Sequence, residues 1–228
     1  MEIMKKKIFK FYILGFILAA AFVACEEEKH EPIVDGGSAP QQVTDVKVIP
    51  TPGGADLVYK LPDNENLLYI EAIVNTPEGK SMKFSASSHR DTISVIGLAT
   101  EKPQEVLLYS VNKGGVKSDP LSVLIDPLTP PYMKVFQSLT MSAGLGGVGI
   151  EYHNESAAEL VFYIGRMING KFVEESFKQL KQENGRYLFW GYPAQEDKFG
   201  VFIRDRWDHY SDTMYADITP ILEIMIDK

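Results

Sequence analysis

Cysteine occurs only once in the 228 residues, so no disulfide can form within the chain. Zinc and iron–sulfur sites that need several thiolates are excluded for the same reason. The four histidines are widely separated and lack the H-E-x-x-H spacing of zinc proteases, and no G-x-S-x-G serine elbow occurs. We therefore predict no metal site, no cofactor and no catalytic residues, and a fold that depends on packed cores.

Basic residues are also in the minority. The chain has 23 Lys and Arg against 31 Asp and Glu, a formal net charge of -8. Nucleic-acid binding depends on a basic surface that releases counterions, so we predict no nucleic-acid partner. Sustained helical periodicity is absent as well, and residues 174–181 are the best short helical candidate. The composition is otherwise that of a globular protein, with 45% hydrophobic and 24% charged residues.

The N-terminus has the organisation of a secretion signal. Lysines 5–7 and 10 precede an apolar run over residues 11–23, and Ala24 is small, which predicts a signal peptide over residues 1–24. The run is shorter than the roughly 20 apolar residues that cross a bilayer. An ordinary secretory leader is one interpretation. A lipoprotein leader is the other, because Cys25 directly follows it.

Phe22-Val23-Ala24-Cys25 resembles a bacterial lipobox. This resemblance implies that Cys25 is lipid-modified and attaches the protein to a membrane. The acidic residues 26–28 resemble the export signal of Bacteroidota lipoproteins, which implies an outer-membrane location facing the cell exterior. Residues 25–42 are rich in Pro and Gly and predict a flexible tether.

Short apolar alternations separated by turn residues then predict a β-sandwich over residues 43–127. The expected strands are 43–48, 55–59, 67–74, 81–85, 92–96, 105–111 and 121–125. This segment resembles a fibronectin type III domain. Pro130 and Pro131, with Pro127 just before them, make residues 128–131 a short, stiff hinge.

A second sandwich is predicted over residues 132–222, followed by a tail over 223–228. Its expected strands are 135–141, 148–152, 159–168, 171–177, 187–190, 198–205 and 213–218. Asn169-Gly170 favours a type I′ hairpin turn. Residues 144–149 match G-x-G-x-x-G, but the alternation that follows is typical of a strand, so a hairpin is favoured over a nucleotide loop. The predicted fold is all-β, with two tandem immunoglobulin-like or fibronectin type III-like β-sandwiches after a lipoprotein signal peptide and tether.

The whole arrangement resembles Bacteroidota surface lipoproteins of polysaccharide-utilisation systems. The resemblance is carried by the lipobox, the fibronectin-like segment, Gly146-Gly147-Val148 and the stretch 199–212 with Arg206-Trp207-Asp208. It implies a polysaccharide or oligosaccharide ligand and outer-membrane uptake proteins as partners. In longer relatives a discoidin-like module follows a segment similar to 219–228, and we expect that module to be absent here.

Both tryptophans lie in the second predicted sandwich, and exposed flat rings are suited to stacking on sugars. The predicted ligand-binding residues are Trp207, Tyr210, Trp190, Tyr192, Arg206 and Asp208. Each tryptophan has an alternative interpretation as a structural core residue. Asp205, Asp208, Asp212 and Glu196 are candidate glycosidase acids, but a chain with 31 acidic residues contains such clusters by chance. The three aspartates could offer oxygen ligands to calcium, but their spacing lacks the EF-hand loop pattern.

Two Asp-Thr-hydrophobic triplets resemble the O-glycosylation signal of exported proteins in this bacterial group, which implies modification at Thr92 and Thr213. The sequence thus favours a non-catalytic, surface-tethered accessory protein that binds glycans or supports an uptake complex. The alternatives are a structural spacer or adhesion module and, third, a hydrolase.

Overall fold

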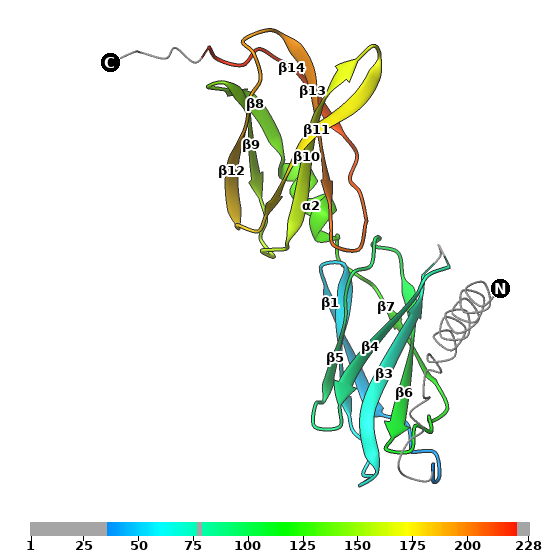
Figure 1. Cartoon of the computed structure of the whole chain (residues 1–228). Helices are drawn as coiled ribbons and strands as arrows, with labels where there is room; N and C mark the ends of the chain where they lie inside the picture. The colour runs from blue at the N-terminus through cyan, green and yellow to red at the C-terminus, as the bar shows by residue number, and fades with distance from the viewer. Residues whose placement is uncertain (1–35, 77–78, 223–228) are drawn as a thin grey trace, which may run out of the picture.

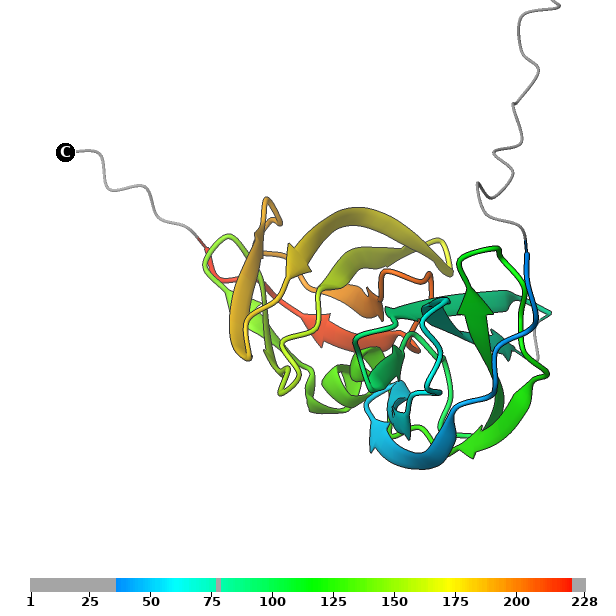
Figure 2. The same ribbon diagram turned by 90° about the horizontal axis from the view of Figure 1, so that it is seen from below.

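The computed structural model describes residues 36–76 and 79–222. Over these residues the chain forms two β-sandwiches that follow one another, with a short helix where they meet (Figure 1). Figure 2 shows that the second sandwich is offset to one side of the first. The predicted all-β fold with two tandem sandwiches is confirmed. The predicted leader, Cys25 and the tail at 223–228 lie outside the described residues.

The first sandwich packs a three-stranded sheet against a four-stranded sheet. The smaller sheet has the order β1 (Thr44–Thr51), β2 (Gly54–Lys60), β5 (Thr92–Val95). The larger has the order β4 (Ser81–Ser87), β3 (Leu67–Asn75), β6 (Gln104–Asn112), β7 (Leu121–Ile125). Ala55, Leu57 and Tyr59 all point into the core, as the period of two in a strand requires.

The second sandwich repeats this division. Its three-stranded sheet has the order β12 (Asn184–Trp190), β9 (Gly147–His153), β8 (Thr140–Gly144). Its four-stranded sheet has the order β11 (Lys171–Leu180), β10 (Leu160–Ile168), β13 (Asp197–Arg204), β14 (Met214–Ile218). Phe199, Val201 and Ile203 are buried in the core of this sandwich. The opposite positions of β13 therefore face away from the core.

The strand predicted over residues 135–141 is wrong. The chain forms helix α2 (Pro131–Ser138) there, and strand β8 begins only at Thr140. Pro131 suits the first helical turn because its missing N–H would have no partner there. Tyr132, Val135 and Leu139 then recur at helical spacing, and all three pack into the core of the second sandwich.

The helical candidate at 174–181 is also wrong, since these residues belong almost entirely to β11. Phe177 pairs with Tyr163 and Leu180 with Leu160 along β10. Cross-strand pairing therefore overrides the local helical preference. Between Ile164 and Gly165 the register shifts, which leaves Glu175 as the extra residue of a bulge.

Both predicted hairpin turns in the second sandwich are present. Gly144 pairs with Gly147 at the tip of the β8–β9 hairpin, so the glycine-rich motif opens a strand. Asn169 and Gly170 have φ values of 52° and 76°, the left-handed pair that a type I′ turn needs.

Tyr59 in the first core provides a stability test. Its hydroxyl is buried without a hydrogen-bond partner among the described residues, and burial, then the charge of Asp91, raises its pKa from 10.0 to about 12. The neutral phenol is therefore favoured in the folded state, and this stabilisation is present below pH 10 and lost as the pH rises toward 12. We expect Tyr59→Phe to raise the unfolding free energy by up to about 1 kcal/mol at pH 7.

Urea unfolding followed by circular dichroism measures this change, and the loss of stability above pH 10 should be smaller in the variant. A decrease in stability at pH 7 would contradict the absence of a partner for the hydroxyl.

Candidate functional site

The loop between β13 and β14 is organised by one carboxylate. Asp205 is only 7% exposed. Its Oδ1 accepts hydrogen bonds from the backbone N–H of Trp207 at 2.8 Å and of His209 at 2.9 Å, and its Oδ2 lies 2.8 Å from His209 Nδ1. Both oxygens of the carboxylate thus take part in shaping the loop, which leaves it poorly placed to serve as an acid or a metal ligand.

Replacing Asp205 removes several hydrogen bonds at once. We expect Asp205→Ala to lower the unfolding free energy of the second sandwich by about 1–3 kcal/mol, because partly buried N–H groups lose their acceptor. Asp208→Asn in the same loop is the control. The Asp208 side chain is exposed, and asparagine tolerates its φ of 65°.

Both tryptophans lie in the second sandwich, so fluorescence during urea unfolding follows that domain. Equal stabilities of the Asp205 and Asp208 variants would contradict the structural role of Asp205.

Trp207 lies at the junction between the two sandwiches. Gly97 in the first sandwich has a φ of 81°, and a Cβ built there would be 2.3 Å from Trp207 Cε2. The Arg206 guanidinium lies 4.2 Å from the centroid of the same indole ring. These two contacts cover much of the ring, so Trp207 joins the domains and offers little free surface for stacking.

Helix α2 adds a second link across the junction. The hydroxyl of Tyr132 donates to the backbone oxygen of Ala99 in the first sandwich at 3.0 Å. Its ring lies 5.9 Å from that of His209. Burial, followed by the negative charge of Asp205, raises the pKa of Tyr132 above its ordinary value, so the hydroxyl stays protonated and able to donate.

Trp190 is at the opposite end of the second sandwich. It pairs with Gly147 at the start of β9, whereas β9 ends at His153, whose N–H bonds Ser138 Oγ of α2 near the junction. Trp190 is 63% exposed. The two tryptophans therefore lie at opposite ends of the second sandwich, separated by the length of β9, and they do not form one site.

The remaining predicted residues are also divided. Tyr192 is buried, and its ring packs 4.9 Å from that of Phe199. Burial, followed by the nearby Glu175, raises its pKa to about 12, although the charge of Arg166 acts in the opposite direction. Asp208 is 3.0 Å from Arg204 Nη1. Tyr210, in contrast, is 55% exposed and turns toward the outer face of the four-stranded sheet.

That outer face holds a continuous set of aromatic rings. We call it the aromatic face, and it consists of Tyr163, Phe172, Phe177, Phe202, Tyr210 and Tyr215. Adjacent ring centroids are 4.8–6.1 Å apart, and the central pair, Tyr163 and Phe202, is stacked with 6° between the planes. Phe177 is 64% exposed and Tyr215 44%. Such a large exposed apolar cluster is characteristic of a binding surface.

A glycine makes room for these rings. A Cβ at Gly200 would be 2.7 Å from Phe172 and 2.8 Å from Tyr215, so both rings lie directly over its backbone. Two cations flank the cluster. Arg204 lies 5.6 Å from the Tyr163 centroid and Lys198 lies 5.7 Å from that of Tyr215. The face therefore combines flat apolar surface with hydroxyl and cationic donors.

Sequence reasoning missed five of these six aromatic residues. The alternating pattern of the strands contained a signal for them, because they occupy outward positions on strands whose inward positions form the core. The missing information was the strand order, which places Phe202 of β13 directly opposite Tyr163 of β10.

The predicted glycosylation sites are partly exposed. Thr92 lies in β5 and its hydroxyl donates to Asp91 at 3.0 Å, while Thr213 immediately precedes β14. Within residues 36–76 and 79–222, no group of three or more His, Cys, Asp or Glu could hold a metal ion. No helix in the described part of the chain is long and apolar enough to cross a bilayer.

Comparisons with known proteins divide the chain into two segments. Residues 40–127 match the family described as Domain of unknown function (DUF4959), and residues 128–228 match Domain of unknown function (DUF5126). No curated protein matches the chain in sequence.

Among solved structures, a SusE-like protein is 22% identical over 40% of this chain, with a TM-score of 0.36. This chain spans about a third of its length, 32%. A two-domain fibronectin type III segment of chicken tenascin is 11% identical over 78% of this chain and 99% of its own, with a TM-score of 0.37.

Proposed function

We propose that this chain is a non-catalytic accessory protein, held at the outer membrane by a lipid on Cys25, that binds glycan chains through the aromatic face of its second sandwich. The observation that carries the proposal is the continuous cluster of six aromatic rings on a rigid, exposed sheet. The C–H face of a pyranose can stack on such rings while its hydroxyls bond to tyrosine and arginine side chains.

The acidic groups near the face support a binding role over catalysis. Asp205 is occupied by three donors of its own loop, and Asp208 is paired with Arg204. Neither carboxylate is without a partner, whereas glycoside hydrolysis needs two available carboxyl groups that flank the bond to be cleaved. The net charge of -8 favours ligands without phosphate groups.

Affinity electrophoresis of the whole protein tests the proposal. We expect retardation in gels that contain a neutral polysaccharide, tested over a panel of different linkages. Trp190→Ala should be retarded as strongly as the unmodified protein, because Trp190 lies on the other sheet. If Trp190→Ala loses retardation, the ligand binds near Trp190 at the end of β12 and not at the aromatic face.

The second candidate is a structural spacer that docks uptake proteins. It is favoured by the junction, where Trp207 packs on Gly97 and Tyr132 bonds Ala99 across the two sandwiches. Migration unchanged by every polysaccharide, together with capture of an outer-membrane transporter in a pull-down, would support the spacer.

A further inference from the structure

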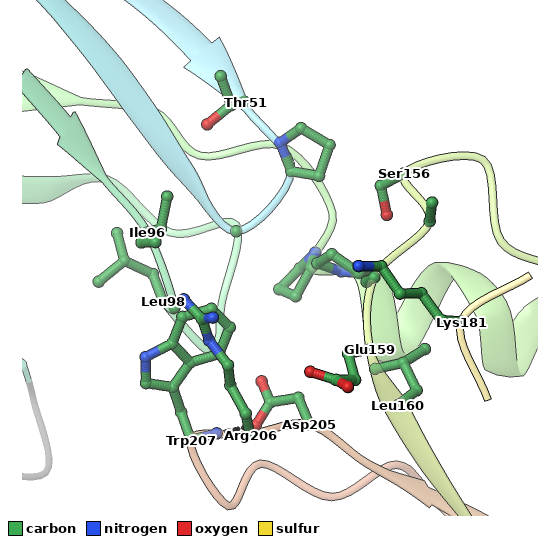
Figure 3. Close-up of a pocket in the computed structure, with 17 residues that line it drawn as sticks. Thr51, Ile96, Leu98, Ser156, Glu159, Leu160, Lys181, Asp205, Arg206 and Trp207 are labelled. Carbon is green, nitrogen blue, oxygen red and sulfur yellow. Dashed lines mark hydrogen bonds between the residues drawn. The ribbon is translucent and has the colours of Figure 1, made fainter. Parts of the chain in front are cut away.

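A pocket of about 440 Å³ lies between the two sandwiches, separate from the aromatic face (Figure 3). The first sandwich contributes residues 51–53 and 96–98 to its lining. Residues 130–131, 156–160, 181 and 205–207 supply the rest. Its volume is within the range that small-molecule sites occupy, and a site between domains is a common location for one.

The walls of the pocket are largely apolar, but four charged side chains line it. Ile96, Leu98 and Leu160 are among the apolar residues. Lys181 and Arg206 lie on opposite sides in the view of Figure 3, with the carboxylate of Glu159 between them.

None of these three charged groups forms an ion pair with another described residue. The fourth charged residue of the lining, Asp205, already bonds with both of its oxygens to its own loop. The free groups of the pocket are thus two cations and one carboxylate.

We propose that this pocket binds a sugar ring that bears a carboxylate. The two cations and the two carboxylates of the lining balance in charge, but Lys181 and Arg206 have no ion-pair partner among the described residues, so each can pair directly with a carboxylate of a ligand. Arg206 can form paired hydrogen bonds with a carboxylate, and Lys181 adds a point charge. Glu159 is available to accept from ring hydroxyls, and the apolar walls suit the C–H surface of the ring.

This site is independent of the aromatic face. Titration of the whole protein with glucuronate, glucose and acetate, followed by calorimetry, tests the inference. We expect binding of glucuronate and at least about tenfold weaker binding of glucose and acetate, because each lacks one of the two recognised parts. Equal affinity for glucose would overturn the charge argument, equal affinity for acetate would show a simple anion site, and no glucuronate binding would refute the proposal.

Variants of the lining residues test whether glucuronate binds in this pocket. Lys181→Gln and Arg206→Gln should each weaken glucuronate binding by about tenfold, and Arg206→Lys should bind more weakly than the unmodified protein but more tightly than Arg206→Gln, because it keeps the charge and loses the paired hydrogen bonds. Lys171→Gln, in β11 and outside the lining, is the matched control and should change nothing. Phe177→Ala should leave glucuronate binding intact, so this proposal and the aromatic face can fail separately.

Discussion

Replacing Gly97 by alanine is expected to separate the two sandwiches. The new Cβ would be 2.3 Å from Trp207 Cε2, and the φ of 81° is itself unfavourable for alanine by about 1–2 kcal/mol. Since the close neighbours are the indole ring, the tryptophan has to leave its place against the first sandwich. Small-angle scattering should then detect a larger radius of gyration, and protease should cut more readily near the junction.

Gly79 provides a matched control for the cost of placing alanine at a positive φ. Its φ of 80° is almost the same, and a Cβ there would meet nothing within 4 Å. Gly79→Ala should therefore cost only the conformational strain and leave the scattering profile unchanged. If the two glycine variants behave alike, the contact with Trp207 does not hold the domains together.

Removing two exposed rings of the aromatic face should abolish most glycan binding. Phe177 and Tyr215 are 64% and 44% exposed, at opposite edges of the sheet on β11 and β14. Each ring that stacks on a sugar is expected to contribute about 1–1.5 kcal/mol, so Phe177→Ala with Tyr215→Ala should weaken binding by about a hundredfold. Calorimetry with the polysaccharide selected by electrophoresis measures this loss.

Leu124→Ala is the control for loss of exposed apolar surface, since Leu124 is 63% exposed on β7 of the first sandwich. It should bind as the unmodified protein does. The double variant should keep its melting temperature, because the replaced rings lie outside the two cores. Unchanged affinity of the double variant would show that the aromatic face does not bind the glycan.

The parts of the fold that depend on local patterns could be predicted from the sequence. Apolar alternation predicted the strand over 198–205, which forms β13, and Asn169-Gly170 predicted the turn between β10 and β11, because strand period and turn chemistry are short-range properties. Helix α2 was missed because its eight residues are too few to show a sustained period.

The candidate site depends on long-range contacts, which local patterns do not encode. Phe202 and Tyr163 meet only because β13 pairs with β10, a strand far away in the sequence. Trp207 was a candidate for sugar stacking, but its neighbour Gly97 belongs to the other sandwich. Tyr210 alone among the predicted binding residues lies on the aromatic face.

Glycan binding at the aromatic face is tested most directly by amide chemical-shift mapping of the isotope-labelled protein during titration with a polysaccharide that it binds. Stacking on the aromatic face predicts that the largest shifts fall on β10, β11, β13 and β14, and that the amides of β8, β9 and β12 change little. Shifts concentrated around Trp190 on β12, or no shifts with any polysaccharide, would contradict it.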